Sequence, residues 1–120
     1  CKCPRTLDLL RALPAVAFAH FARFPPGACT DTRCGATNAQ LTCAADLMGL
    51  ADGLDGTLVF VAREEPWLAA PDAGLLVFDD SYEHSFQNPT EEECVLLLVH
   101  FWHPEVPSSD WEWISQCLLD

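Results

Sequence analysis

The feature that most constrains this chain is a nine-residue apolar run, CVLLLVHFW, from Cys94 to Trp102. A membrane-spanning helix needs roughly 18 to 20 apolar residues, so this run is too short to cross a bilayer as a helix. Its content of Val, Leu and Phe is typical of a strand that is buried on both faces. We therefore expect this segment to form the centre of a sheet.

Shorter strand-like segments precede this run. The residues from Val16 to Phe24 alternate large and small side chains and end at Pro25–Gly27, which predicts a strand and a tight turn. The stretch from Cys43 to Leu50 is rich in alanine and fits a helix as well as a strand, so both alternatives stay open. Three further strands, separated by Asp-Gly and Pro-Asp turn signals, are predicted at Leu41–Ala45, Thr57–Ala62 and Gly74–Phe78.

The two helices that we predict outright lie near the two ends. Leucines at helical spacing predict a short amphipathic helix over Thr6–Leu13, between Pro4 and Pro14. Ser109 followed by Glu112 forms a capping-box pattern for a last helix, which we expect to pack against the outside of the sheet. The sequence therefore predicts one mainly β domain, residues 1–120, with flanking N- and C-terminal helices.

Composition excludes several classes of partner. The formal charge of −12 makes phosphate backbones and anionic membranes poor partners, so neither nucleic acid binding nor membrane insertion is expected. The seven cysteines show no C-x-x-C spacing, which favours scattered thiols with one or two disulfides over a zinc site. The chain opens at Cys1 and not at Met, so we expect it to be part of a longer protein.

The stretch from Val77 to Phe86, VFDDSYEHSF, is the most informative for chemistry. Phosphate-binding glycine loops and the common hydrolase and zincin motifs are absent from the sequence. In this stretch a strand runs into two aspartates and a turn that ends at His84. Such a histidine is either structural or, where it faces into a barrel, a metal ligand.

Paired motifs give the chain a resemblance to a known family. Phe78–His84 reads FDDSYEH, and eighteen residues after His84 the sequence W-H-P-E begins at Trp102. These motifs, together with four upstream ones, resemble the aspartyl/asparaginyl β-hydroxylase domain along essentially the whole chain. The upstream motifs are C-P-R-T at Cys3–Thr6, Leu13–Pro14, F-x-x-x-x-P-G at Phe21–Gly27 and G-A-T-N at Gly35–Asn38.

The resemblance implies a fold and an activity. Family members are double-stranded β-helices (jelly-roll, cupin-like domains) that hold Fe(II) through histidines and bind 2-oxoglutarate beside it. They hydroxylate Asp or Asn side chains, so the implied partner is a protein or peptide that carries these residues. Family domains begin further upstream, so the first strands are expected to be missing here. Some family members are luminal, which makes the secretory pathway a conceivable setting, although these residues do not define a compartment.

Carried over residue by residue, the family's site is incomplete. His84 matches the second iron ligand, whereas Arg33 stands where the first iron histidine belongs; a guanidinium has no lone pair to give to a metal. Thr37 and Asn38 of the same motif are assigned to cofactor binding. The basic residue that anchors 2-oxoglutarate would fall at Cys94, and a second co-substrate contact would fall at Ala44. Arg33, Ala44 and Cys94 are therefore the degenerate positions, where the residue that the family's site requires is replaced.

Replacement ligands remain an open alternative. Asp31 or Cys34 would supply a ligand if the loop is shifted, and His20 or His100 would do so by pointing inward from neighbouring strands. A lone histidine is nevertheless more often satisfied within the core, which is the interpretation we prefer for His100.

The roles of the other polar residues are structural in our interpretation. Arg33 pairs either with an anionic ligand or, as we prefer, with Asp79 or Asp80. Both aspartates are expected to orient the turn through bonds to the backbone. His103 is expected to cap or pack at a strand end.

Three functions follow from this reading. The first is an aspartyl/asparaginyl β-hydroxylase whose iron and co-substrate binding is impaired or lost, with Fe(II) and 2-oxoglutarate as cofactors if it is active and none otherwise. The alternative is a non-catalytic peptide-binding or scaffolding module. A third, a cupin-like pocket for a small molecule, rests on the expected fold alone.

Overall fold

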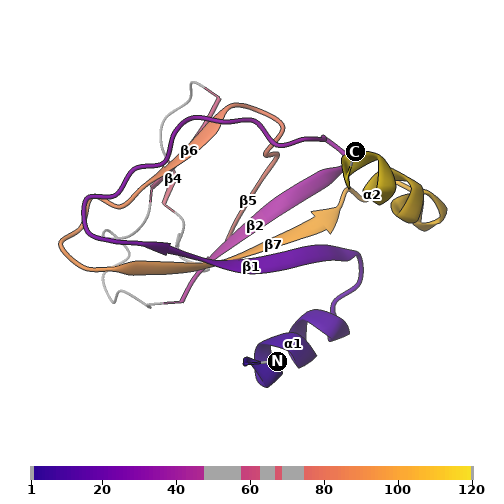
Figure 1. Ribbon diagram of the computed structural model, residues 1–120, viewed down its shortest axis with the longest axis horizontal. Coiled ribbons are helices and arrows are strands. Elements are labelled where there is room, and N and C mark those ends of the chain that lie inside the picture. Colours follow the sequence, from indigo (N-terminus) through magenta and orange to yellow (C-terminus); the bar gives the residue numbers. More distant parts are fainter. Residues whose placement is uncertain (1, 48–57, 63–66, 69–74, 120) are drawn as a thin grey trace.

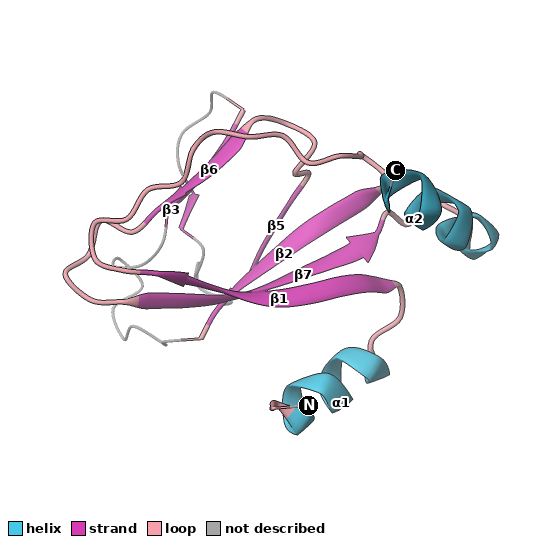
Figure 2. Cartoon of the chain, viewed as in Figure 1, coloured by secondary structure: helices cyan, strands magenta, loops and turns pink. Residues whose placement is uncertain are grey.

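The computed structural model describes residues 2–47, 58–62, 67–68 and 75–119. In these ranges strands form the body of the molecule and the two α-helices lie outside it (Figures 1 and 2). In chain order the elements are α1 (Pro4–Ala12), β1 (Val16–Phe24), β2 (Gln40–Asp46), β3 (Leu58–Val61), β4 (Trp67–Leu68), β5 (Leu75–Phe78), β6 (His84–Gln87), β7 (Cys94–Trp102), the 3-10 turn η1 (Ser108–Asp110) and α2 (Trp111–Leu119).

The strands form two antiparallel sheets, as expected for a jelly roll. The larger sheet has the order β1-β7-β2-β5 and the smaller one has the order β4-β3-β6. Strand β7 lies between β1 and β2 and is buried on both faces, which confirms the prediction for Cys94–Trp102. Non-consecutive strands are neighbours in both sheets, so the sheets are held together by contacts between distant parts of the chain.

The core lies between the two sheets, where strands from each contribute alternate residues. In β5, for example, Leu76 and Phe78 are buried whereas Leu75 and Val77 are exposed. This period of two is what a strand with one face on a core requires. The buried cluster comprises Phe24, Ala44, Val59, Leu76, Phe78, Phe86, Cys94, Leu96 and Leu98.

The segment of residues 25–39 runs beside β6 and covers its outer edge (Figure 1). Two isolated bridges attach it, one between Cys29 and Gln87 and one between Arg33 and His84. Between them the backbone N–H of Thr30 donates to the carbonyl of Phe86 over 3.0 Å. An otherwise open strand edge is thereby paired, and the segment is fixed against the smaller sheet.

Asn88 ties the end of β1 to the loop between β6 and β7. Its side chain is fully buried, and its Nδ2 donates to the carbonyls of Phe24 at 2.9 Å, Glu92 at 2.8 Å and Pro25 at 3.2 Å. Its Oδ1 accepts from the backbone N–H and the hydroxyl of Thr90. One side chain thus connects backbone groups of two separate loops through hydrogen bonds.

The outer face of the larger sheet is apolar. Strand register places Phe21, Leu97, Ala45 and Leu75 in one row across all four strands on this face. Phe21 is 47% exposed and Leu75 is 52% exposed. The larger sheet therefore has one face in the core and a second that is apolar and partly open to solvent.

The helices pack lightly, and neither has a buried residue. Helix α1 begins at Pro4, where a proline at the first position costs no hydrogen bond. Helix α2 contacts the larger sheet through Trp111, whose ring stacks on Trp102 with centroids 5.8 Å apart. No described helix has the length and apolar character that crossing a membrane requires.

The predicted capping box is wrong. Ser109 lies within the 3-10 turn η1, which follows Pro107 as its N-cap without a side-chain cap bond. The helical turn therefore begins before Ser109, at Ser108. A residue that already lies inside a helical turn does not cap the helix that follows.

The remaining strand predictions agree with the structure to within a residue or two, and β1 has the predicted bounds. Residues 43–46 belong to β2, so the strand alternative holds for them, while residues 48–50 lie outside the described residues, as do Thr57 and Gly74. The expected disulfides are not found among Cys29, Cys34, Cys43, Cys94 and Cys117, which are free thiols.

Candidate functional site

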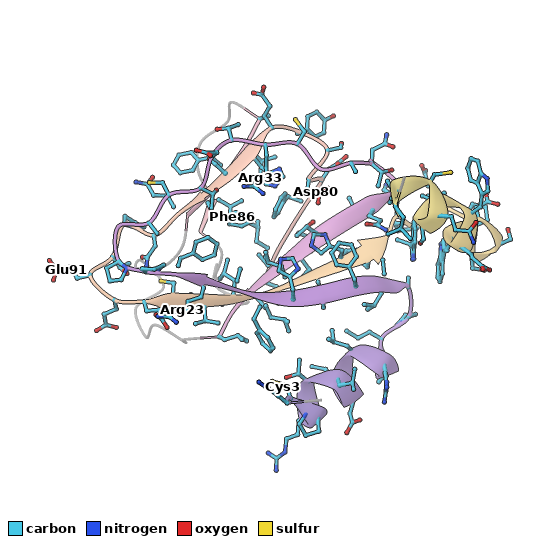
Figure 3. The ribbon with its side chains drawn as sticks, in the orientation of Figure 1. Cys3, Arg23, Arg33, Asp80, Phe86 and Glu91 are labelled. Carbon is cyan, nitrogen blue, oxygen red and sulfur yellow. The ribbon has the colours of Figure 1, made fainter. Side chains whose placement is uncertain are left out.

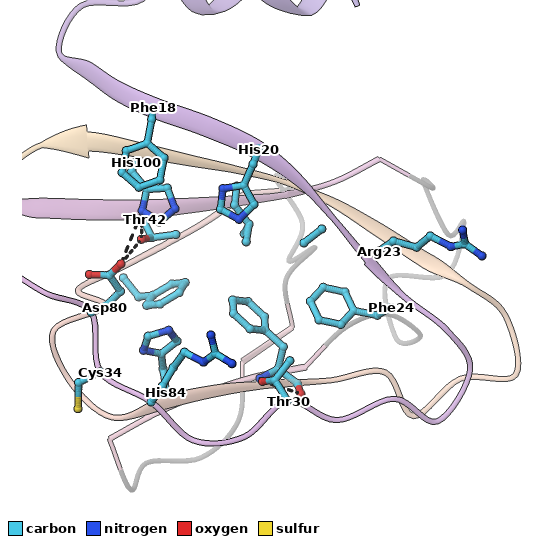
Figure 4. A pocket seen from close by; sticks show the side chains of 16 residues that line it. Phe18, His20, Arg23, Phe24, Thr30, Cys34, Thr42, Asp80, His84 and His100 are labelled. Carbon is cyan, nitrogen blue, oxygen red and sulfur yellow. Dashed lines mark hydrogen bonds and ion pairs between the residues drawn. The ribbon is translucent and has the colours of Figure 1, made fainter. Parts of the chain in front are cut away.

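A pocket of about 520 Å³ opens between the two sheets. Its walls come from the inner face of the larger sheet, from β6 and from the segment that covers β6, as Figure 4 shows. The lining residues are Phe18, His20, Ala22, Arg23, Phe24, Thr30, Arg33, Cys34, Gly35, Thr42, Phe78, Asp80, His84, Phe86, Leu98 and His100.

Strand register brings four side chains to one wall, three of them polar. His100 of β7 lies opposite Phe18 of β1 and opposite Thr42 of β2, so all three face the pocket. His20, two residues beyond Phe18, shares this face because side chains alternate along a strand. The rings of Phe18 and His100 stack with centroids 4.1 Å apart, and His20 lies 5.4 Å from His100.

His100, Thr42 and Asp80 form a hydrogen-bonded chain. The hydroxyl of Thr42 donates to Oδ2 of Asp80 over 3.0 Å, and the same hydroxyl lies 3.0 Å from Nδ1 of His100. Because a threonine hydroxyl carries a single proton, Nδ1 of His100 is the donor in the second bond. Asp80 also lies 3.6 Å from that nitrogen as an ion-pair partner.

This arrangement sets the charge of Asp80. Burial raises the pKa of Asp80, but hydrogen bonds from His100 and Thr42, with the nearby charges of His100 and His84, outweigh it and bring the pKa below the ordinary 3.8. Asp80 is therefore a carboxylate at neutral pH. Burial and the neighbouring His100 both lower the pKa of His20, so its neutral form is favoured.

His84 lies on the opposite wall from His100 (Figure 4). It exchanges two backbone hydrogen bonds with Arg33, of 3.0 and 2.9 Å. Its Nδ1 lies 3.1 Å from the carbonyl of Tyr82, and since a carbonyl only accepts, Nδ1 carries the proton. The lone pair of neutral His84 is therefore on Nε2, as metal coordination by that nitrogen requires.

Gly35 allows the segment after Arg33 to approach the aspartate turn. Its N–H donates to the carbonyl of Asp80 over 2.6 Å. A Cβ at this position would stand 2.5 Å from Oδ1 of Asp80 and 3.0 Å from its backbone oxygen. Only glycine fits so close an approach.

Arg33 lines the pocket without an acidic partner among the described residues. It lies with Asp80 and Phe86 between β6 and the larger sheet (Figure 3). The expected ion pair with Asp79 or Asp80 is wrong for the described chain, because Asp80 pairs with His100 instead. The second arginine of the pocket, Arg23, pairs with Glu93.

The turn-forming roles divide between the two aspartates. Asp79 accepts the backbone N–H of Ser81 over 2.9 Å, which confirms its predicted role. The side chain of Asp80 instead binds Thr42 of β2, so the prediction of a backbone bond is wrong for it. His103 accepts the N–H of Glu105 just after β7, as predicted for a cap at a strand end.

Several residues singled out in the sequence do not reach the pocket lining. Ala44 and Cys94 are completely buried in the core cluster. Thr37 and Asn38 lie outside the lining, and the hydroxyl of Thr37 accepts the N–H of Ala39 in a local turn. Asp31 is exposed and also lies outside it.

Other candidates are brought together. Cys34, His20 and His100 line the pocket with His84 and Arg33, so the inward position that the sequence left open as an alternative for the two histidines is the one they occupy. Sequence reasoning missed the role of Thr42, which connects His100 to Asp80. The available signal was positional, since alternation along Gln40–Asp46 places Thr42 on the face that carries Ala44.

The two sheets and the pocket between them define a cupin-type, double-stranded β-helix domain. Solved structures agree at the level of the fold. The Cnp3 cupin domain of Schizosaccharomyces pombe superposes with a TM-score of 0.53 at 18% identity, covering 75% of this chain and 58% of that one. The protein TT1209 of Thermus thermophilus superposes with a TM-score of 0.50 at 20% identity, covering 82% of this chain and 95% of that one.

Sequence comparison identifies the family. Residues 1–104 match the family described as Aspartyl/Asparaginyl beta-hydroxylase, and the chain belongs to this family. It is 29% identical over 118 residues to the mouse (Mus musculus) and human (Homo sapiens) proteins called Aspartate beta-hydroxylase domain-containing protein 1, with 91% of this chain aligned. It spans 31% and 29% of their respective lengths, less than a third of each.

The donor set of the described pocket does not fit the Fe(II) that this family type implies. Among the described residues, no three His, Cys, Asp or Glu side chains converge so as to hold a metal ion. His84 has a suitable lone pair, but its backbone partner on the neighbouring segment is Arg33, a permanent cation without one. Asp80, the carboxylate of this lining, is already engaged by Thr42 and His100.

Proposed function

We propose that this chain is a binding module of the aspartyl/asparaginyl β-hydroxylase family, which holds a protein or peptide segment at its pocket without the iron-dependent reaction. Carbonyl and carboxylate groups of such a segment are suitable partners for Arg33. The residues of the segment would enter a pocket whose size falls within the range of roughly 300–1,000 Å³ that small-molecule sites occupy. Asp or Asn side chains are the natural candidates in this family.

One observation carries the proposal: the backbone pair between Arg33 and His84. The pair fixes the two residues side by side on adjacent segments at the pocket wall. In the family's motif the position of Arg33 belongs to the first iron ligand. A cation fixed beside His84 opposes the binding of a second cation at the same place.

A second candidate is the Fe(II)- and 2-oxoglutarate-dependent hydroxylation of Asp or Asn side chains. It is favoured by the three imidazoles that line one pocket, those of His20, His84 and His100. The Nε2 lone pair of His84 also favours it. In this alternative one of the other histidines, or Cys34, replaces the ligand that Arg33 does not supply.

Anaerobic titration with Fe(II), in the presence and absence of 2-oxoglutarate, distinguishes the two. Calorimetry and the charge-transfer absorbance of the chelate are the measurements. We expect no stoichiometric binding by the unaltered chain. Arg33→His should raise the affinity for Fe(II), because it adds an imidazole next to His84, whereas the matched control Arg5→His, on the exposed surface of α1, should not. Stoichiometric binding of Fe(II) and 2-oxoglutarate by the unaltered chain would establish the second candidate instead.

A further inference from the structure

We infer that the pocket recognises a carboxylate that carries an apolar body, with Arg33 as the anchor of the carboxylate and no metal between them. The inference rests on the proposed function and names the chemistry of the ligand. It concerns a group that the iron-dependent reaction does not use, the guanidinium of Arg33.

The charges of the pocket lining lead to Arg33. Arg23 is paired with Glu93, and Asp80 is engaged by Thr42 and His100. Among the described residues, the guanidinium of Arg33 has neither an ion pair nor a hydrogen bond. The described lining therefore has one permanent charge that no described side chain neutralises, and it is positive.

The walls around this charge are largely apolar. Buried aromatic rings of Phe24, Phe78 and Phe86 form much of the interior, with Leu98 beside them. The ring of Phe86 lies 5.5 Å from that of Phe24 and 6.2 Å from that of Phe78, so the three form one continuous surface. Arg33 itself is exposed, so an ion pair with it would lie at the solvent-facing rim of this apolar surface and be partly screened by water.

These two features together select the ligand class. A guanidinium matches a carboxylate with two parallel N–H donors, and the aromatic surface accepts an apolar or aromatic body attached to it. A second anionic group on the ligand would enter a pocket that already contains the carboxylate of Asp80. The pocket is therefore suited to a monocarboxylate and less suited to a dicarboxylate.

The carboxylate could belong to a free small acid or to the acidic side chain of a peptide, and matched pairs of probes separate these sources. Hydrocinnamate and its neutral amide represent the free acid. A capped dipeptide of phenylalanine and aspartate, with its asparagine counterpart, represents the peptide. Each is titrated by calorimetry into the full chain in the presence of EDTA, and succinate serves as the dicarboxylate.

We expect at least one acid to bind without metal and its neutral counterpart to bind roughly threefold to fivefold more weakly, because the ion pair with exposed Arg33 is partly screened by solvent. Arg33→Gln should lower the affinity for the acid by a similar factor, whereas Arg5→Gln should leave that affinity unchanged. Circular dichroism and melting of both variants establish that they are folded.

The other outcomes separate the two proposals. Equal affinity for acid and amide, an unchanged affinity in Arg33→Gln, or no binding of any probe would overturn the carboxylate site. If the chain at the same time binds no Fe(II), the proposed metal-free module stands without this ligand. Binding of an acid only after Fe(II) is added would overturn both.

Discussion

Replacing Asn88 with alanine tests whether one buried side chain stabilises the connection between β1 and the loop after β6. Asn88 connects the end of β1 to the loop that leads into β7, and Phe24, whose carbonyl it binds, lines the pocket. Alanine removes the two N–H donors and the acceptor while leaving the backbone bonds of residue 88 available. The carbonyl of Phe24 would then lose its bond from Asn88, while the carbonyl of Glu92 would keep the hydroxyl of Thr90 as a donor.

The structure gives the size of the effect. A typical hydrogen bond contributes about 1 kcal/mol net, and a buried group left without a partner costs about 1–3 kcal/mol. Asn88 makes two strong donor contacts, of 2.8 and 2.9 Å, and accepts two bonds from Thr90. We therefore expect the free energy of unfolding to fall by about 3 kcal/mol, which corresponds to a decrease of roughly 10 °C in the melting temperature of a domain of this size.

Urea denaturation followed by tryptophan fluorescence measures this loss directly. Glu91→Ala is the matched control, because Glu91 is exposed in the same loop and should change the stability by less than about 0.5 kcal/mol. A loss below about 1 kcal/mol for Asn88→Ala, with an unchanged dependence on urea, would show that water replaces these bonds and that the argument from burial is mistaken.

Three further predictions concern the site and the thiols. Gly35→Ala should lower the free energy of unfolding by roughly 1–3 kcal/mol, and with it the melting temperature, because the added Cβ would collide with Asp80. An unchanged melting curve would contradict the close approach. Asp80 has a lowered pKa in the folded state, so its contribution is present above pH 3.8, the ordinary value, and is lost as the pH falls through the lowered one; Asp80→Asn should flatten the stability profile there, and an unaltered profile would refute this. Under native conditions iodoacetamide should modify exposed Cys117 and Cys29 rapidly and buried Cys94 slowly, as mass spectrometry of peptides will report, and equal rates would contradict the burial of Cys94.

The sequence was a good guide to the strands because the apolar pattern has a physical cause. The run from Cys94 to Trp102 is buried on both faces in β7, and the bounds of β1 follow from the turn at Pro25–Gly27. The start of the last helix was less predictable. Its Ser109 fits a cap by residue type, but the turn had already begun at Ser108 after Pro107.

The site was predictable in its parts but not in its connections. His84 and Arg33 were singled out from the motifs, and both line the pocket. The partner of Asp80 was predicted incorrectly because it depends on strand pairing. Thr42 and His100 are 58 residues apart and become neighbours only through the register of β2 with β7. Local sequence does not specify such a register.

The apolar outer face of the larger sheet also has a consequence for contacts between copies of this chain. β1 is one of the two outermost described strands of that sheet, and its far edge offers backbone groups to another chain beside the exposed ring of Phe21. A charge of −12 keeps copies apart, but at 0.1 M salt this repulsion extends only about 10 Å. We therefore expect added salt to weaken the repulsion between copies while the attraction between apolar faces remains, so self-association should increase with salt concentration.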